Sequence, residues 1–129
     1  MSIAMQRSRS RGVLSVLVFL AATQAHSQTA PAGNAVHGKD LYQQCTSCHS
    51  IDENDIGPKH RGVVGRKAGT AADYAYSPAL QSSGIVWDAA NLDRWLTNPS
   101  AMVPGTKMYF LLKNPQDRAD IIAYLNELK

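Results

Sequence analysis

Two cysteines stand three residues apart in this chain of 129 residues, and a histidine follows the second one directly: Cys45-Thr46-Ser47-Cys48-His49. Two thiols one helical turn apart can add to the two vinyl groups on one edge of a porphyrin, which forms two thioether bonds. The adjacent imidazole then lies on one face of the ring, within reach of its iron. This spacing is typical of covalent haem attachment. It predicts that Cys45 and Cys48 bind one haem and that His49 binds its iron.

A thiol–disulfide redox pair is the main competing interpretation of the two cysteines, because exported oxidoreductases use the same spacing. Such a pair is expected at the start of a helix that follows a strand, within alternating strands and helices. No convincing strand pattern precedes Cys45, and redox chemistry of this kind does not need the adjacent histidine. The residues further along the chain favour covalent haem attachment over a thiol–disulfide pair.

The first 27 residues have the three parts of a secretory signal peptide. Basic residues come first, a mainly apolar stretch follows, and small residues end the segment: Arg7, Arg9 and Arg11, then Val13–Ala22, then Ala25–Ser27. The apolar stretch is shorter than the roughly 20 residues of a permanent membrane helix. We expect residues 1–27 to be a cleaved signal peptide, with an uncleaved anchor as the alternative. Residues 28–33 are then a flexible lead-in, and residues 34–129 form one periplasmic domain.

The processed chain, residues 28–129, carries no net charge. Three of the 13 basic residues lie in the leader, and the other ten are balanced by ten acidic residues. That balance argues against a partner such as nucleic acid, which needs an excess of Lys and Arg. Leu, Ile, Val and Phe supply only 19 of these 102 residues. Burial of so few apolar side chains barely offsets the conformational entropy that the chain loses on folding. A large apolar cofactor would complete the hydrophobic core.

A second axial ligand for the iron must come from a short list of residues. Beyond the leader, the methionines and the remaining histidines are Met102, Met108, His37 and His60. A constrained loop precedes Met108, because Pro104 fixes φ and Gly105 permits a turn without a Cβ clash. Such a loop can hold a thioether against the open face of a haem. Met102, by contrast, is typical of core packing.

The chain resembles the class I cytochromes c, the soluble electron carriers of mitochondria and bacteria, from about Gly38 to Leu128. The segments that carry the resemblance are Cys45–His49, Gly57-Pro58, Gly62–Gly69, Tyr76, Gly84–Trp87, Asn98-Pro99, Pro104–Met108 and Arg118–Leu125. The resemblance implies an all-α fold, with three main helices and loops wrapped around one covalently bound haem. We also expect a monomer.

The resemblance further implies roles for individual residues. His49 and Met108 are implied to be the proximal and distal iron ligands, and the Pro58 carbonyl to accept the His49 ring N–H. Other side chains are implied to surround the haem propionates, where buried anionic charge needs hydrogen-bond donors. These are Arg66, Tyr76, Trp87 and Thr106. Ordinary packing is the alternative for Arg66, Tyr76 and Trp87.

Three residues depart from the family pattern. Trp95 stands where relatives often have a tyrosine near the methionine ligand, and Leu80 where they often have an asparagine. An indole can donate a hydrogen bond but not accept one, so both changes are expected to alter the polarity around the Met108 sulfur. His60 stands where relatives usually have a leucine against the haem. A shifted loop with His60 in solvent is favoured over a buried imidazole, and we do not expect His60 to bind iron.

Local patterns predict three helices. Asp88 is expected to cap a helix whose apolar stripe of Leu92, Trp95 and Leu96 ends before Pro99. Asn114 and Pro115 are expected to open the last helix. The apolar residues of that last helix form one broad inward face: Ile121, Ile122, Tyr124, Leu125 and Leu128.

The first helix is expected from about Val36 into the cysteine motif. It contains Gly38, which costs about 1 kcal/mol relative to alanine inside a helix. A close crossing with the last helix, near Ile121 and Tyr124, would explain why glycine is present. Residues 51–86 are expected to be mostly loops around one edge of the haem.

Histidine and methionine together fill both axial sites of a haem iron, which suits electron transfer and opposes substrate binding. We therefore expect a soluble periplasmic monohaem carrier, not an enzyme, whose partners are a protein redox donor and acceptor such as a membrane complex or a periplasmic dehydrogenase. Two alternatives remain open: a haem peroxidase or gas-binding cytochrome with an open iron site, and a cytochrome subunit docked in a larger complex. The candidate lysines for partner contact are Lys59, Lys67, Lys107 and Lys113.

Overall fold

The computed structural model describes residues 30–129. The predicted signal peptide, residues 1–27, lies outside the described residues, as do the first two residues of the predicted lead-in. Within residues 30–129 the chain forms helices and irregular loops, and the only β pairing is a single antiparallel bridge between Lys67 and Val86. No helix in this range is both long enough and apolar enough to cross a membrane. The prediction of an all-α fold is confirmed.

The described helices are α1 (Ala35–Leu41), the 3₁₀-helix η1 (Tyr42–Gln44), α2 (Pro78–Gln81), α3 (Ala89–Thr97), α4 (Pro99–Met102) and α5 (Pro115–Glu127). The three predicted helices correspond to α1 with η1, α3 and α5. The sequence analysis did not predict the one-turn helices α2 and α4. Each begins with a proline, and the side chain of Ser77 or Asn98 caps the amide three residues further on, which is a favourable start for even a short helix.

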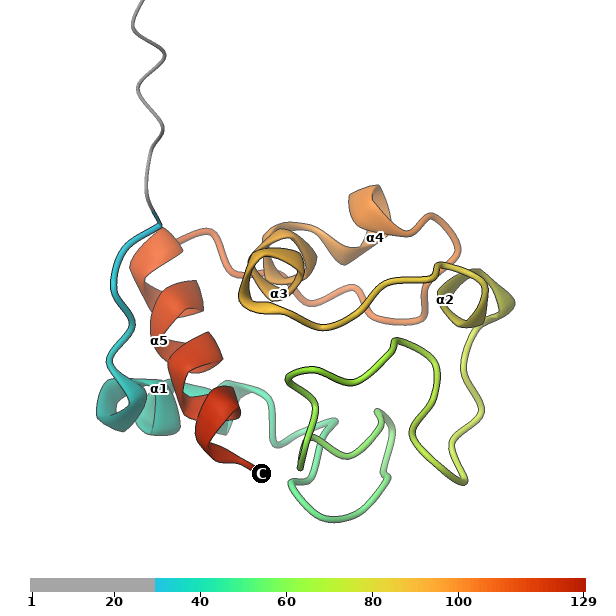
Figure 1. Cartoon of the computed structure of the whole chain (residues 1–129), viewed down its shortest axis with the longest axis horizontal. Coiled ribbons are helices and arrows are strands. Elements are labelled where there is room, and N and C mark those ends of the chain that lie inside the picture. The colour runs from blue at the N-terminus through green and yellow to red at the C-terminus, as the bar shows by residue number, and fades with distance from the viewer. Residues whose placement is uncertain (1–29) are drawn as a thin grey trace, which may run out of the picture.

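Helices α1 and α5 cross at one end of the molecule (Figure 1). A Cβ atom at Gly38 would lie 2.5 Å from the carbonyl carbon of Asp120 and 3.0 Å from the amide nitrogen of Ile121. Only glycine allows the two backbones to approach this closely. The predicted explanation for Gly38 is therefore confirmed. Asn34, which caps α1, also donates its backbone N–H to the Asp120 carboxylate at 2.7 Å.

The segment before α1 also contacts α5. The side-chain amide of Gln116 donates a hydrogen bond to the Ala32 carbonyl, with 2.9 Å between the two atoms. A Cβ atom at Gly33 would overlap the backbone of Ala119. Residues 32 and 33, which fall within the predicted lead-in, thus lie against the last helix.

Side chains cap α3 and α5 as the sequence predicts. The Asp88 carboxylate accepts the Asn91 N–H at 2.7 Å, and the Asn114 side chain accepts the Gln116 N–H at 2.9 Å. Each cap satisfies an amide that has no partner inside its helix. Helix α3 contacts α5 and buries the predicted apolar stripe, Leu92, Trp95 and Leu96.

Loops form much of the remaining molecule. In Figure 1 the loops between η1 and α2, drawn in green, occupy the lower part of the view, and α3, α4 and the segment before α5 occupy the upper part. Buried apolar side chains come from both parts and from the helix crossing: Tyr42, Val63, Ala68, Leu80, Trp87, Leu92, Trp95, Leu96, Val103, Leu112, Ile121, Tyr124 and Leu125. Many of them face a cavity between the two parts.

Candidate haem site

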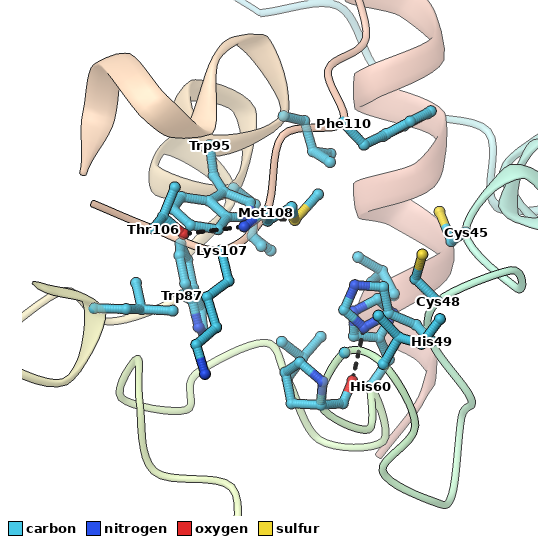
Figure 2. A pocket seen from close by; sticks show the side chains of 18 of the residues that line it. Cys45, Cys48, His49, His60, Trp87, Trp95, Thr106, Lys107, Met108 and Phe110 are labelled. Atoms are coloured by element: carbon cyan, nitrogen blue, oxygen red, sulfur yellow. Dashed lines mark hydrogen bonds between the residues drawn. The ribbon is translucent and has the colours of Figure 1, made fainter. Parts of the chain in front are cut away.

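A cavity of about 460 Å³ lies between the loops that follow η1 and the segment that contains α3 and residues 104–110. Apolar and aromatic side chains supply most of its lining, among them Leu80, Trp87, Leu92, Leu96 and Leu125. A few polar groups reach into it from the loops (Figure 2). A large, mainly apolar cavity with a small number of polar groups is the usual form of a cofactor site. All ten predicted site residues line this one cavity.

The thiols of Cys45 and Cys48 lie at the same edge of the cavity (Figure 2). A turn after η1 produces this arrangement, because the amides of Cys48 and His49 both donate to the Cys45 carbonyl, at 3.1 and 2.9 Å. Neither cysteine is in a disulfide. Burial raises the pKa of the Cys45 thiol to about 11, whereas redox-active thiol pairs need a lowered pKa. The site therefore disfavours the thiol–disulfide interpretation.

The imidazole of His49 is held by the backbone that follows it. Its Nδ1 lies 2.8 Å from the Pro58 carbonyl oxygen, and a carbonyl can only accept, so Nδ1 carries the proton. This leaves the Nε2 lone pair free to bind a metal. Burial lowers the pKa of His49, which favours the neutral form that a metal requires.

Gly57 is a site residue that the sequence analysis did not single out for contact with a ligand. A Cβ atom at Gly57 would lie 2.5 Å from Nδ1 and 2.7 Å from Nε2 of His49, so the ring packs directly on the glycine backbone. A glycine immediately before Pro58 was the available signal, because close approach of a ring to backbone requires a missing Cβ.

Met108 points into the cavity from the side opposite His49 (Figure 2). The preceding loop turns at Gly105, which has a φ of +90° that side chains other than glycine rarely adopt. The Met108 amide donates to the Thr106 hydroxyl oxygen at 3.4 Å. Met102 lies in α4 and lines a separate, smaller pocket, so the two methionines occupy different places.

Trp95 contacts the predicted sulfur ligand directly. Its indole Nε1–H donates a hydrogen bond to Met108 Sδ, with 3.1 Å between nitrogen and sulfur. Its ring packs against that of Trp87 at a centroid distance of 5.1 Å. Leu80 lines the same cavity and is buried. The environment of the sulfur thus combines one N–H donor with apolar side chains.

The predicted propionate partners surround another part of the cavity: Arg66, Tyr76, Trp87 and Thr106. The Arg66 guanidinium donates to the backbone carbonyls of Lys59 and Arg61, at 2.8 and 3.2 Å, and is half-buried. Burial lowers the pKa of Arg66, although an arginine remains charged at neutral pH. The Trp87 indole lines the same cavity, and its N–H can donate to a ligand.

The favoured expectation that His60 lies in solvent is wrong. The His60 ring is stacked on the His49 ring, with 4.0 Å between centroids and 21° between planes, and its Nδ1 lies 2.9 Å from the Tyr42 hydroxyl. Burial lowers the pKa of His60 to about 3, so the ring is neutral. The backbone explains the placement: the His60 amide donates to the Ser50 carbonyl at 3.1 Å, which ties this loop to the residue after His49.

An apolar rim borders the mouth of the cavity. Ile56, Tyr109 and Phe110 line the cavity and are 70%, 76% and 41% exposed. The sequence analysis missed this rim, although the uninterrupted apolar run Tyr109–Leu112 directly after Met108 was a usable signal. Large apolar side chains exposed together often mark a contact surface.

The residues present fit a covalently bound haem. Two thiols stand at one edge of an apolar cavity, and an imidazole nitrogen and a thioether sulfur enter it from opposite sides. Nitrogen and sulfur donors of this kind are those that hold haem iron in electron carriers. The donors near Arg66 and Trp87 could meet the carboxylates of a porphyrin.

Comparisons with known proteins agree with this geometry. A family model described as Cytochrome c matches residues 35–129. The cytochrome c2 of Rhodomicrobium vannielii is 50% identical over 98 residues, which cover 73% of this chain and 78% of the relative. The cytochrome c of Gossypium barbadense is 43% identical over 108 residues, which cover 80% of this chain and 97% of the relative.

Two solved structures resemble the fold. Cytochrome cH from Methylobacterium extorquens has a TM-score of 0.72 at 45% identity and covers 74% of this chain and 99% of its own. The ferricytochrome c2 of Rhodopseudomonas palustris has a TM-score of 0.71 at 42% identity, with the same coverage. The family implies one covalently bound haem c, for which the two cysteines are present. The resemblance drawn from the sequence motifs is confirmed: this chain belongs to the cytochrome c family and is a class I, monohaem c-type cytochrome that carries electrons.

Proposed function

We propose that this chain is a soluble, monomeric, periplasmic carrier of single electrons, with His49 and Met108 as axial ligands and Cys45 and Cys48 as thioether donors. The observation that supports it most is that the two axial donors enter one cavity from opposite sides, next to both thiols. When bound, the haem supplies a one-electron couple at its iron. Residues 1–27 would direct export and then be removed.

The chain itself holds both ligands in place. Pro58 keeps the proton on His49 Nδ1, so that Nε2 stays a lone-pair donor. Trp95 fixes the Met108 sulfur through its indole N–H. With His49 and Met108 holding the iron, no position would be open to peroxide or a gas, which disfavours the enzyme and gas-binding alternatives. If these contacts keep the same geometry in both oxidation states, they would also keep the reorganisation on electron transfer small.

In this proposal Arg66 would neutralise the haem propionates, and hydrogen bonds from Tyr76, Trp87 and Thr106 would orient them. Arg66 retains charge, and two of its N–H groups are already held by backbone carbonyls, so its position is set before any ligand binds. Thr106 is only 3% exposed, which makes its hydroxyl a buried partner close to Met108. Hydrogen bonds to an ionised carboxylate are stronger than neutral ones.

The apolar rim (Ile56, Tyr109 and Phe110) is the proposed place for contact with redox partners. It borders the mouth of the cavity, and electron transfer is faster when the distance between two cofactors is short. Lys107 lines the same cavity, but its ammonium donates a hydrogen bond to the Ala75 carbonyl at 2.8 Å. The partners would be a protein donor and acceptor, either a membrane complex or a periplasmic dehydrogenase.

Spectra of the purified protein test the site. We expect the chain to retain the mass of one haem after denaturation, because thioether bonds survive it. The ferric protein should be low-spin at neutral pH, with the weak far-red absorption of a methionine–iron bond. A high-spin ferric spectrum at neutral pH would instead favour a peroxidase or gas-binding protein. A colourless product with only the mass of the bare polypeptide would overturn the proposal.

Fractionation of producing cells tests the location and the assembly state. We expect the haem protein in the periplasmic fraction, with an N-terminus near residue 28, and a sedimentation coefficient of a monomer. Stable co-purification with a dehydrogenase or an oxidase would favour a permanently docked subunit. Recovery in the membrane fraction with the leader intact would favour an N-terminal anchor.

A further inference from the structure

His60 and Tyr42 lie together on the cavity wall beside His49, and the proposed function uses neither. The rings of His60 and His49 are close to parallel, with 4.0 Å between their centroids and 21° between their planes. Figure 2 shows the two imidazoles next to each other, on the side of the cavity away from Met108. The Tyr42 hydroxyl is 2.9 Å from His60 Nδ1.

The other contacts of His49 leave one motion of its ring weakly restrained. The hydrogen bond from Nδ1 to the Pro58 carbonyl fixes the direction of one N–H group. A single hydrogen bond at one edge of the ring still lets the ring rock by a small angle about its Nε2 direction, because a hydrogen bond tolerates moderate departures from linearity. The backbone of Gly57 blocks part of that motion by contact. A flat neighbour that lies parallel to the ring restrains the rocking most directly.

His60 is itself anchored by a rigid group. Tyr42 is 3% exposed, and its ring meets that of Tyr124 edge to face, with 5.3 Å between centroids. Tyr124 belongs to α5, which crosses α1 through the Gly38 contact. The Tyr42 hydroxyl therefore connects the crossing of α1 and α5 to the ring that touches His49.

A merely space-filling role does not account for a histidine at this place. An aliphatic side chain could occupy the same space without burying polar nitrogens, which is unfavourable unless they are hydrogen-bonded. An imidazole offers two properties that an aliphatic chain lacks, a flat face and a nitrogen that can be held by a hydroxyl. Both are used in the structure, the face against His49 and Nδ1 against Tyr42.

We infer that His60 is a positioning residue for His49: the Tyr42 hydroxyl holds the His60 ring, and the stacked His60 ring sets the plane of the His49 imidazole about its Nε2 direction. The inference rests on the proposed role of His49 as an iron ligand. The plane of an axial imidazole determines how the unpaired electron of ferric haem is distributed over the four pyrroles. His60 thus controls a property of the oxidised protein without touching the bonds to iron.

Proton NMR of the ferric holoprotein tests this inference, because the order and spread of the four haem methyl resonances report the plane of the axial imidazole. We compare the wild type with His60→Leu, Tyr42→Phe and the double variant. Both single variants should change the methyl pattern in the same sense. The double variant should match His60→Leu, because the Tyr42 hydroxyl acts on His49 only through His60.

Tyr124→Phe is the matched control, since it removes a hydroxyl from the same aromatic group but not the one bonded to His60. Its methyl pattern should equal that of the wild type. An unchanged methyl pattern in His60→Leu overturns the inference. The inference is also overturned if Tyr42→Phe causes the same change in the methyl pattern whether residue 60 is His or Leu. If His60→Leu does not fold, an unchanged pattern in Tyr42→Phe overturns it alone.

The same samples separate this inference from the proposed function. The far-red methionine–iron band of the wild type tests the axial ligand pair. Variants that keep this band and the wild-type methyl pattern would refute the positioning role of His60 and leave the carrier function standing. Absence of the band from the wild type would refute the ligand assignment itself.

Discussion

The indole N–H of Trp95 donates a hydrogen bond to the sulfur of Met108, with 3.1 Å between Nε1 and Sδ. A donor on the sulfur withdraws electron density that the sulfur would otherwise give to ferric iron. The contact therefore favours the reduced state and raises the reduction potential. It joins α3 to the loop that carries the predicted distal ligand.

Removal of this hydrogen bond should lower the reduction potential. A neutral hydrogen bond contributes about 1 kcal/mol, which corresponds to roughly 40 mV for a one-electron couple. We expect Trp95→Phe to lower the potential by at most that amount and to move the far-red methionine–iron band. Potentiometric titration and ferric spectra measure both. Trp87→Phe is the control for the band, because Trp87 packs on Trp95 but makes no hydrogen bond to the sulfur.

Loss of the Met108 thioether should open the iron without releasing the haem. We expect Met108→Ala to bind exogenous imidazole or cyanide readily and to have a lower potential, by an amount on the order of 0.1 V within the roughly 0.8 V range that axial ligands cover. Met102→Ala is the matched control, since Met102 lines a different pocket. Ligand titrations followed by absorption decide the matter. If Met102→Ala binds exogenous ligands readily and Met108→Ala does not, the assignment of Met108 as the iron ligand is wrong.

A methyl group at Gly57 should displace the His49 ring. Its Cβ would lie 2.5 Å from Nδ1 and 2.7 Å from Nε2, and neither the ring nor the backbone can yield without losing the Pro58 hydrogen bond. We expect Gly57→Ala to change the ferric spectrum and to lower the free energy of unfolding. Gly84→Ala is the control: its φ of +69° makes alanine strained, but no atom lies within 4 Å of its Cβ. That variant should lose about 1–2 kcal/mol and keep the wild-type spectrum.

The His37–Asp120 pair should make stability depend on pH. Its Nδ1 and Oδ2 atoms are 2.7 Å apart, with Asp120 buried at 3% exposure. Their hydrogen bond raises the pKa of His37 above 6.5 and, as its largest cause, lowers the pKa of Asp120 below 3.8. The contribution of His37 is therefore complete below pH 6.5 and is lost as the pH rises through its pKa in the folded protein. The contribution of Asp120 is complete above pH 3.8 and is lost as the pH falls through its lowered pKa.

Urea unfolding of the holoprotein and of His37→Gln measures this dependence. The wild type should exceed the variant in free energy of unfolding by the largest margin near pH 5 to 6, and the margin should shrink as the pH is raised past the folded-state pKa of His37. A margin that stays constant from pH 5 to 9 would show that the two side chains are not an ion pair in solution.

Association with a redox partner should depend only weakly on salt. Residues 28–129 contain equal numbers of basic and acidic residues, and the rim beside the cavity is apolar. An increase in ionic strength from about 0.01 M to about 0.15 M shortens the Debye length from about 30 Å to about 8 Å. We expect the bimolecular electron-transfer rate to change by less than about tenfold over this range. Stopped-flow kinetics with a purified partner complex measure it, and a steeper fall would indicate docking by charge.

Local features of the chain were sufficient for the helices and for the candidates around the cofactor. Asp88 and Asn114 cap helices through atoms only two or three residues away, so the sequence around each position is enough to predict the cap. The spacing of Cys45, Cys48 and His49 is likewise set within one turn of backbone. The ten site residues proposed from motifs line one cavity, although their individual roles remain predictions.

Contacts between distant segments were decided only by the tertiary structure. The stack of His60 on His49 depends on how the loop after Pro58 folds back toward Ser50. The sequence alone does not reveal this backbone contact, and a polar residue in a glycine-rich loop is then expected to lie in solvent. The bond from Trp95 to Met108 joins a helix to a loop 13 residues later. A helical stripe shows that Trp95 is buried, but it does not identify the atom its N–H meets. The composition predicts that a cofactor must complete the core, because the chain has few large apolar side chains. Only the packing of distant segments determines which side chains line the cavity for that cofactor.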